Sequence, residues 1–265
     1  MQYADVPGSA AQLPQSLAGL RVLVTRPAHQ ADNLCRLIAT LGGRPLRLPL
    51  LDIVPVPHAA GAQRLLDAAR GFDWWIFTST NAVEYARSLA QGDWPAQLAA
   101  VGLATAAALE AGGHVVTTPL GAYSSEGLLE LPQFQEIAGQ SILLVTGEGG
   151  LEALAPVLRA RGARVEVAAV YRRVPLPYAG ERVAELLRAC DVIVISSGEA
   201  LEHLLRLAPP EAQAMLRRRQ LVVPGPRMVE KATQLGFRAP LMPEKMSDAG
   251  IVHALERAHT PKQAT

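Results

Sequence analysis

The chain has 265 residues, enough for one large domain or two small ones, because single hydrophobic cores rarely grow beyond about 250 residues. It is 49% hydrophobic but only 5% aromatic, a composition expected for helices packed on a parallel sheet. Its 25 Lys and Arg residues nearly balance 24 Asp and Glu, and the formal net charge of +1 argues against a broad electrostatic surface for nucleic acid or an anionic membrane.

The cysteines and the first residues predict a cytoplasmic protein. Cys35 and Cys190 each fall in or beside an apolar segment, which favours two buried, reduced thiols over a disulfide or a metal site. The first 15 residues lack the basic start and apolar run of a signal peptide, and no apolar segment approaches membrane-spanning length. Because no long apolar stripe demands a dimer, we expect a monomer.

The chain contains an internal repeat. In each half, a buried strand ends in Thr and leads into a helix, and a later strand ends in a turn rich in Ser or Thr that opens an amphipathic helix. The offsets are steady: Thr25 and Thr146 are 121 residues apart, and Ser125 and Ser247 are 122 apart. Such steady offsets indicate two aligned domains. The matching segments are 21–27 with 141–149, 44–57 with 164–177, 72–90 with 190–208, 99–115 with 221–239, and 123–132 with 245–255.

The order of elements predicts an α/β fold with two similar doubly wound, mostly parallel-sheet domains. Each half reads strand, helix, strand, strand, helix, strand, helix and a short capped helix. In such sheets ligands bind beyond the carboxyl ends of the strands, where loops lead into helices. The hydroxyl-rich turns of the repeat lie at these loops.

Two proline-punctuated segments, about 49–57 and 168–177, predict a two-stranded β linker. If the chain crosses there twice, residues 17–50 and 176–265 form a discontinuous domain, and residues 54–170 form a continuous one. The active site is then expected in the cleft between the two domains.

No metal or nucleotide motif stands out in the sequence. The six histidines are scattered, and none lies at ligand spacing from another or from a cysteine. The turn at 146–150 (TGEGG) lacks both the Lys of a P-loop and the glycine spacing of a dinucleotide fingerprint.

The strand-to-helix loops offer backbone N–H groups and hydroxyls that suit carboxylates. N-capping alone would select the same residue types, so both readings stay open. The candidates for binding an anion in this way are Ser79, Thr80, Asn81, Ser124, Ser125 and Ser197.

Arg26 and Tyr171 each have two readings. Arg26 follows the first strand, where its guanidinium can bind a carboxylate or form a salt bridge within the domain. Tyr171 lies in the returning linker, where its ring can pack on the hinge or its hydroxyl can donate a proton in a dry cleft.

Taken in order, five motifs resemble the uroporphyrinogen-III synthase family over about 20–257. Any one of them is only moderately specific, but their order and spacing make the likeness strong. A departure is the turn at Val222–Ala232, which lacks a threonine common in the family and has Arg227 nearby. The motifs are VLVTRPAHQADNLCRLIATLGGRPLRLPLLDIVP, FTSTNAVEYA, AVGLATAAALEAGG, SSEGLLELP and GARVEVAAVYRRVP.

The resemblance implies a hydro-lyase that cyclises hydroxymethylbilane to uroporphyrinogen III, with inversion of ring D and loss of water, in tetrapyrrole biosynthesis. It implies neither a metal nor an organic cofactor, and it allows direct transfer of substrate from hydroxymethylbilane synthase. By position, Tyr171 matches the tyrosine proposed to assist departure of the hydroxyl group. Ser79, Thr105 and Ser197 match cleft residues thought to position the substrate, and Arg26 matches the family's arginine after the first strand. Arg26 and Arg227 are further substrate-binding candidates.

Two other classes of function remain open from the sequence. One is a non-catalytic binding protein of the same shape for an anionic metabolite. The other is a glycosyltransferase of two α/β domains, although no nucleotide-binding signature supports it. Tyr171 and Thr105, the matches to the family's site, favour the enzyme.

Overall fold

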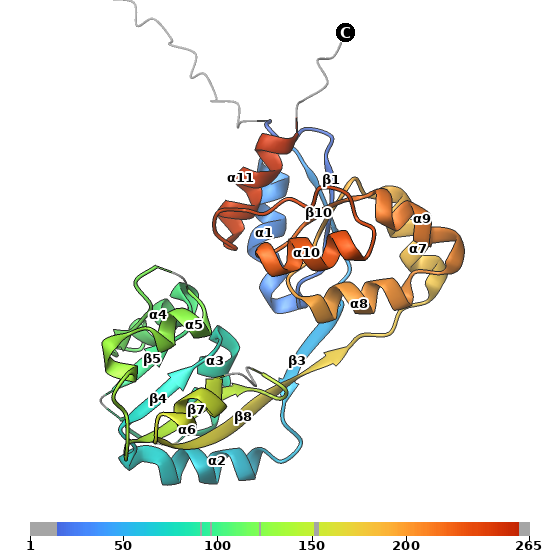
Figure 1. Cartoon of the computed structure of the whole chain (residues 1–265). Coiled ribbons are helices and arrows are strands. Elements are labelled where there is room, and N and C mark those ends of the chain that lie inside the picture. Colours follow the sequence, from blue (N-terminus) through green and yellow to red (C-terminus); the bar gives the residue numbers. More distant parts are fainter. Residues whose placement is uncertain (1–14, 91, 96, 122, 151–153, 260–265) are drawn as a thin grey trace, which may run out of the picture. The chain divides into compact units, whose positions relative to one another are not determined.

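The computed structural model (Figure 1) describes residues 15–90, 92–95, 97–121, 123–150 and 154–259. They form two compact units. Unit 1 consists of the described residues up to Asp52 and from Pro175 onward, and unit 2 of those in Ile53–Val174. No described helix is long and apolar enough to cross a membrane. The predicted α/β fold with two mostly parallel sheets is confirmed.

Unit 1 contains a four-stranded sheet with helices on both faces. Neighbouring strands pair in parallel, in the order β10-β9-β1-β2. The strands are β1 (Arg21–Val24), β2 (Arg44–Arg47), β9 (Val192–Val194) and β10 (Gln220–Val222). Helices α1 (Ala28–Thr40) and α11 (Asp248–Ala258), side by side in Figure 1, cover one face. The other face carries α7 (Gly180–Ala189), α8 (Gly198–Leu207), α9 (Pro210–Arg218) and α10 (Pro226–Gln234).

Alternation along the strands explains this layering. Successive side chains of a strand point to opposite faces of the sheet. In β1, Leu23 packs in the cluster with α7 to α10, while Val22 and Val24 pack in the cluster with α1 and α11. Apolar residues at consecutive positions are therefore buried on both faces, as in other parallel sheets.

The second sheet has six strands in the order β3-β8-β7-β4-β5-β6. They are β3 (Leu51–Pro55), β4 (Trp74–Phe77), β5 (Leu98–Ala100), β6 (Val116–Thr117), β7 (Ser141–Gly147) and β8 (Arg164–Pro175). One face carries α2 (Ala59–Ala68), the 3₁₀ turn η1 (Ala69–Gly71), α3 (Thr80–Leu89) and α4 (Leu103–Glu110). The other carries α5 (Ser125–Leu129), η2 (Pro132–Phe134) and α6 (Leu154–Ala160).

The strand order confirms the repeat. The order β5-β4-β7-β8 in the second sheet corresponds strand by strand to β10-β9-β1-β2 in the first. These are the strands that the matching segments of the sequence predict. The predicted domain and linker boundaries remain predictions.

The expected order of elements was wrong in omitting α2, α7 and α9. Helices α2 and α7 occupy equivalent places in the two units: α2 precedes β4, and α7 precedes β9, the strand that corresponds to β4. Helix α2 lies between β3 and β4 of the second sheet, and α7 connects β8 of that sheet with β9 of the first. Helix α9 has no counterpart among the described residues of unit 2.

The repeat extends to two aspartates that precede β4 and β9. Asp73 accepts a hydrogen bond from the backbone N–H of Ser141 at 2.7 Å, and Asp191 accepts one from that of Arg21 at 3.0 Å. Ser141 and Arg21 are the first residues of β7 and β1. Each aspartate thus fixes the start of the neighbouring strand. Hydrogen bonds from the backbone N–H and the side chain of Ser141 lower the pKa of Asp73. The side chain and the backbone N–H of Arg21 lower the pKa of Asp191.

Candidate functional site

The candidate residues gather at the carboxyl ends of parallel strands. In unit 2, β4 is followed by Thr78 and Ser79, and β7 ends in a glycine turn. Because paired parallel strands end at the same edge of a sheet, these loops lie at one edge. In unit 1 the corresponding loops follow β1, β9 and β10.

Tyr171 and Ser79 are in direct contact. Tyr171 lies in β8 and is 4% exposed, and its hydroxyl is 3.1 Å from Oγ of Ser79, where either oxygen can donate. Ser79 is the N-cap of α3, and its Oγ also accepts from the backbone N–H of Ala82 at 3.1 Å. A hydroxyl has one proton and two acceptor sites, so Ser79 satisfies both contacts at once. The phenol is thereby held at the start of α3.

Two neighbours of Tyr171 are not among the site residues predicted from the sequence. Tyr85 of α3 stacks on the Tyr171 ring, with centroids 5.8 Å apart and planes at 30°. Gly147, the last residue of β7, lies so close to that ring that it leaves no room for a Cβ atom. The signal in the sequence is the glycine at the end of the repeated strand, in the turn at 146–150.

The remaining candidates of unit 2 lie at helix starts. Thr80 and Asn81 are the first two residues of α3 and are half-buried. Thr105 is the third residue of α4 and is 5% exposed. Ser124 is the N-cap of α5 and accepts from the backbone N–H of Gly127 at 3.2 Å. Ser125, the first residue of α5, is buried.

The candidates of unit 1 show one matching cap and one ion pair. Ser197 is the N-cap of α8 and accepts from the backbone N–H of Ala200 at 3.2 Å, which makes it the counterpart of Ser79. Arg26 forms an ion pair with Asp248 at the start of α11, so the salt-bridge reading holds for Arg26 in this structure. Its guanidinium has further N–H donors, and binding of an anion by Arg26 stays a prediction. Arg227, the second residue of α10, is exposed.

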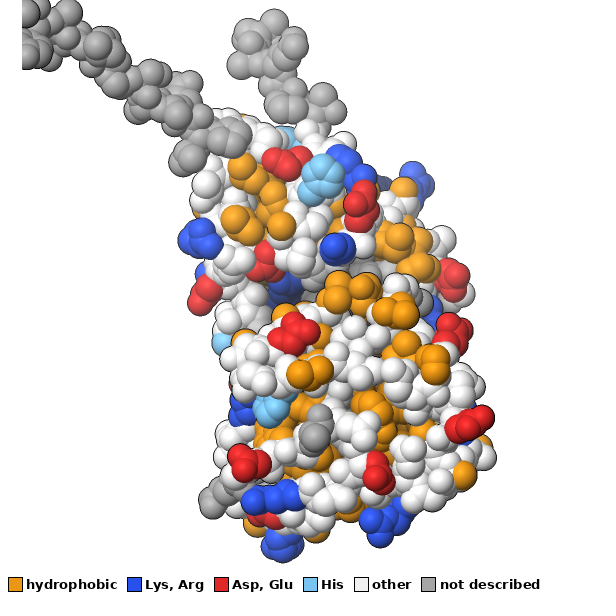
Figure 2. Space-filling view, turned by 90° about the vertical axis from the view of Figure 1, so that its left-hand side faces the viewer, with side chains coloured by type: hydrophobic (Ala, Val, Ile, Leu, Met, Phe, Trp, Pro, Cys, Tyr) orange, Lys and Arg blue, Asp and Glu red, His pale blue; other side chains and the backbone are white. Residues whose placement is uncertain are grey.

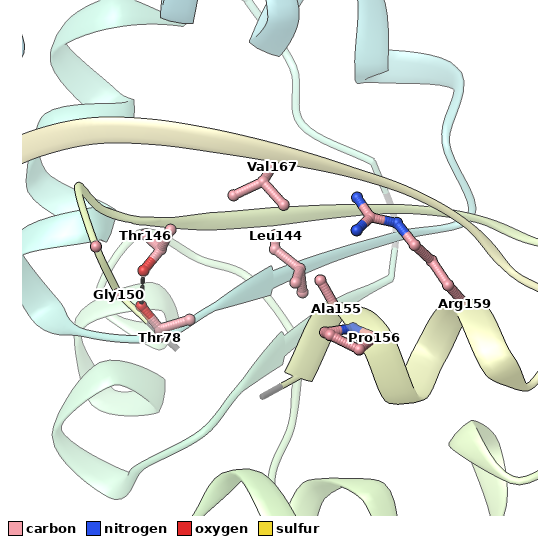
Figure 3. Close-up of a pocket in the computed structure, with 9 residues that line it drawn as sticks. Thr78, Leu144, Thr146, Gly150, Ala155, Pro156, Arg159 and Val167 are labelled. Atoms are coloured by element: carbon pink, nitrogen blue, oxygen red, sulfur yellow. Dashed lines mark hydrogen bonds between the residues drawn. The ribbon is translucent and has the colours of Figure 1, made fainter. Parts of the chain in front are cut away.

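A hollow of about 320 Å³ lies beside the strand ends, on the sheet face that carries α6 (Figure 3). At one end of it Thr78 donates from Oγ1 to Oγ1 of Thr146 at 2.9 Å, the bond dashed in Figure 3. At the other end Nη2 of Arg159 donates to the carbonyl of Val165 at 2.8 Å. Tyr171 packs in the cluster on the opposite face of the sheet. The hollow is therefore separate from the Tyr171–Ser79 contact.

Neither metal ligands nor reactive thiols mark the described residues. No group of three or more His, Cys, Asp or Glu side chains among them could hold a metal ion. Cys35 and Cys190 are free and buried; burial raises the pKa of the Cys35 thiol, and it raises that of Cys190 to about 11. On the face shown in Figure 2, acidic and basic side chains are interspersed, in keeping with the near-zero net charge.

Comparisons with known proteins agree on one family. The model of the family described as uroporphyrinogen-III synthase HemD matches residues 32–253. The uroporphyrinogen-III synthase of Escherichia coli (strain K12) is 32% identical over 246 residues, covering 89% of this chain and all of that protein. The one from Salmonella typhimurium (strain LT2) is 30% identical, with the same coverage.

Two solved structures show the same fold. A mutant uroporphyrinogen III synthase from the extremely thermophilic bacterium Thermus thermophilus has a TM-score of 0.63 at 24% identity, covering 91% of this chain and 98% of that one. Uroporphyrinogen-III synthetase from Helicobacter pylori 26695 has a TM-score of 0.58 at 15% identity, covering 91% of this chain and all of that one.

Proposed function

The chain belongs to the uroporphyrinogen-III synthase family. We propose that it catalyses cyclisation mainly by holding the ends of the substrate together, and that Tyr171 is the acid that protonates the leaving hydroxyl group. The enzyme is a hydro-lyase of porphyrin biosynthesis. Its substrate is hydroxymethylbilane, and its products are uroporphyrinogen III and water.

The reaction needs one proton at the start. The hydroxyl group of the bilane leaves as water, pushed out by the electron pair of its own pyrrole nitrogen, once the oxygen has received a proton. The substituted carbon of ring D then attacks the resulting azafulvene, and a spiro intermediate rearranges with ring D inverted. Loss of one proton restores the ring D pyrrole and balances the proton taken up at the start. Holding the chain ends together can contribute about 7–11 kcal/mol to such a closure. A positioned acid adds about 10²-fold or more.

The Tyr171–Ser79 contact is the observation that carries the proposal. Tyr171 is buried, and its hydroxyl is 3.1 Å from Oγ of Ser79 at the N-terminus of α3. A proton leaving the phenol leaves negative charge on its oxygen, and the positive end of a helix dipole favours such charge. Ser79 can donate its own proton to the phenol oxygen at that moment, so one hydroxyl supports both protonation states.

We propose that the helix starts hold the substrate's eight carboxylates. The N-caps Ser79, Ser124 and Ser197 support this, because backbone N–H groups at such termini bind carboxylates. Binding of the substrate between the two units stays a prediction from the resemblance. The further residues proposed to bind substrate are Arg26, Thr80, Asn81, Thr105, Ser125 and Arg227.

We also propose a cytoplasmic monomer that receives its substrate directly from hydroxymethylbilane synthase. The two free, buried cysteines support the location, since thiols stay reduced in the cytoplasm. Light scattering of the enzyme alone and with that synthase would test the other two statements.

The test is a coupled assay that supplies freshly made hydroxymethylbilane and separates type I from type III porphyrins. We expect the enzyme to give type III, and Tyr171→Phe to lower kcat about 10²-fold without abolishing it. Tyr178→Phe is the matched control, because its hydroxyl donates to the carbonyl of Pro49 at 2.9 Å, outside the candidate site. Full turnover, or complete loss in a folded Tyr171→Phe protein, would refute the role of Tyr171.

A further inference from the structure

We propose that Gly147 and Tyr85 are positioning residues, which fix the Tyr171 hydroxyl at the start of α3. This inference rests on the proposed role of Tyr171 as the acid. It assigns a function to two residues that the sequence did not single out as candidates. Both contact the Tyr171 ring.

Gly147 makes room for the ring. A Cβ atom at this position would lie 2.5 Å from Cζ of Tyr171, 2.6 Å from its Cε2 and 2.9 Å from its hydroxyl oxygen. The φ angle of Gly147 lies outside the left-handed region, so the backbone itself would accept alanine. What glycine provides here is space at the end of the ring that carries the hydroxyl.

An irregularity in the sheet brings the two residues together. Along the β7–β8 pair, Thr146 lies opposite Ala169 but Gly147 lies opposite Tyr171, so the register shifts by one residue on β8. Such bulges re-aim side chains and are common beside active sites. The backbone N–H of Glu148 donates to the carbonyl of Tyr171 at 2.8 Å and fixes the shifted register.

Tyr85 ties the ring to the helix that Ser79 caps. Its ring stacks on that of Tyr171, and its own hydroxyl donates to the carbonyl of Ile53 at 2.8 Å. Ser79 and Tyr85 both belong to the α3 segment, as its N-cap and its sixth residue. The hydroxyl and the ring of Tyr171 are therefore held by the same rigid element.

The contacts of Gly147 and Tyr85 with the ring fix the position of the Tyr171 hydroxyl in addition to stabilising the fold. A misplacement of about 1 Å at a reacting group can cost about 10²-fold in rate. Any displacement of the ring by a Cβ at position 147 moves the hydroxyl, the atom closest to Ser79. We therefore expect changes at these positions to act on kcat through Tyr171.

The first experiment compares Gly147→Ala with Gly71→Ala. An added Cβ at Gly71 meets nothing within 4 Å, so this control makes the same chemical change without a clash. We expect Gly147→Ala to lower kcat about 10- to 100-fold with KM within about twofold, and Gly71→Ala to leave both near the original values. In a Tyr171→Phe background, Gly147→Ala should lower kcat by less than about twofold, because the hydroxyl is already gone.

The second experiment uses Tyr85, in case Gly147→Ala does not fold. Tyr85→Leu removes the stacked ring, whereas Tyr85→Phe keeps the ring and loses the hydroxyl that donates to the carbonyl of Ile53. We expect Tyr85→Phe to restore most of the kcat lost in Tyr85→Leu, and the loss in Tyr85→Leu to disappear in the Tyr171→Phe background. Equal losses with and without the Tyr171 hydroxyl would show a merely structural role and overturn the inference.

The outcomes separate this inference from the proposal it rests on. If Tyr171→Phe keeps full turnover, the acid role fails and the positioning role fails with it. If Tyr171→Phe loses activity while folded Gly147→Ala and Tyr85→Leu keep theirs, the acid role stands and only the positioning role is overturned.

Discussion

Ser79 and Ser197 occupy equivalent positions in the repeat and differ in one contact. Each caps a ten-residue helix by accepting a backbone N–H three residues on. Of the two, Ser79 also contacts the Tyr171 hydroxyl. The repeat therefore supplies a pair of serines in which capping and support of the acid can be separated.

We predict that Ser79→Ala and Ser197→Ala each destabilise the protein by about 1 kcal/mol, the usual cost of losing an N-cap. Ser79→Ala should also lower kcat, because it removes the partner of the proposed acid. Ser197→Ala should instead raise KM, as expected for a carboxylate-binding cap. Urea unfolding and steady-state kinetics of both variants check this; equal effects on kcat would contradict the assigned difference.

At the residue scale, the sequence predicted Tyr171 and Ser79 as site residues but not their contact with each other. Tyr171 was assigned through the family resemblance, while its neighbours Ser79, Tyr85 and Gly147 come from two other segments. The register shift that places Gly147 opposite Tyr171 leaves no pattern in the sequence. For Arg26 the sequence left two readings open, since its partner Asp248 lies 222 positions away.

At the scale of elements, each unit has a matching hydrogen bond between a helix and the segment that connects the two units. Tyr85 of α3 donates to the carbonyl of Ile53, and His203 of α8 is 2.8 Å from that of Leu176 through Nε2. A carbonyl can only accept, so Nε2 of His203 carries a proton. Each unit thus holds the segment entering or leaving it by the same turn of the same helix.

The two aspartates at the strand starts predict acid sensitivity. Their folded pKa values lie below the ordinary 3.8. Their stabilisation is therefore fully present above about pH 4 and is lost as the pH falls through the lower folded values. We predict that Asp191→Asn lowers the urea midpoint at pH 7 and that the gap to the parent protein narrows below pH 4.

The exposed carboxylate Glu136 provides the control for this prediction. Glu136→Gln should leave the midpoint at pH 7 close to that of the parent protein, whereas Asp73→Asn should behave like Asp191→Asn. A gap that stays constant from pH 7 to pH 3 would contradict the assigned role of the Asp191 carboxylate.

The strand order was predictable from the sequence because duplicated segments fold alike, whereas three helices were missed. Helix α7 has a clear amphipathic pattern, with Val183, Ala184, Leu186 and Leu187 buried. The repeat was found from the matched strands and from the helices that follow them, whereas α2 and α7 each precede a matched strand. Helix α9 has no copy in the described part of unit 2 and so could not be found from the repeat.

At the scale of the molecule, the four core clusters of the described residues each lie within one unit. The residues that can report on unfolding are divided between the units in the same way. Both cysteines, Cys35 and Cys190, lie in unit 1, and the three tryptophans, Trp74, Trp75 and Trp94, lie in unit 2. Thiol labelling therefore reports on unit 1 and tryptophan fluorescence on unit 2.

We predict that the two units unfold in separate steps, because each buries its own core. In a urea titration, the midpoint of tryptophan fluorescence should differ from that of thiol labelling. Both thiols should react slowly in the native protein, since burial raises their pKa values and limits access. Coincident transitions would show that the units unfold together.

The discontinuity of unit 1 has a consequence for synthesis on the ribosome. Unit 2 is continuous and is complete when Val174 emerges, whereas β1 pairs with β9, and Arg21 and Asp191 are 170 positions apart. At about 5–20 residues per second, the wait is roughly 10–30 s. During that time the edge of β1 that will pair with β9 has no partner strand, so unit 1 begins before unit 2 but is completed after it, and its exposed strand edge is a place where a chaperone would protect the nascent chain.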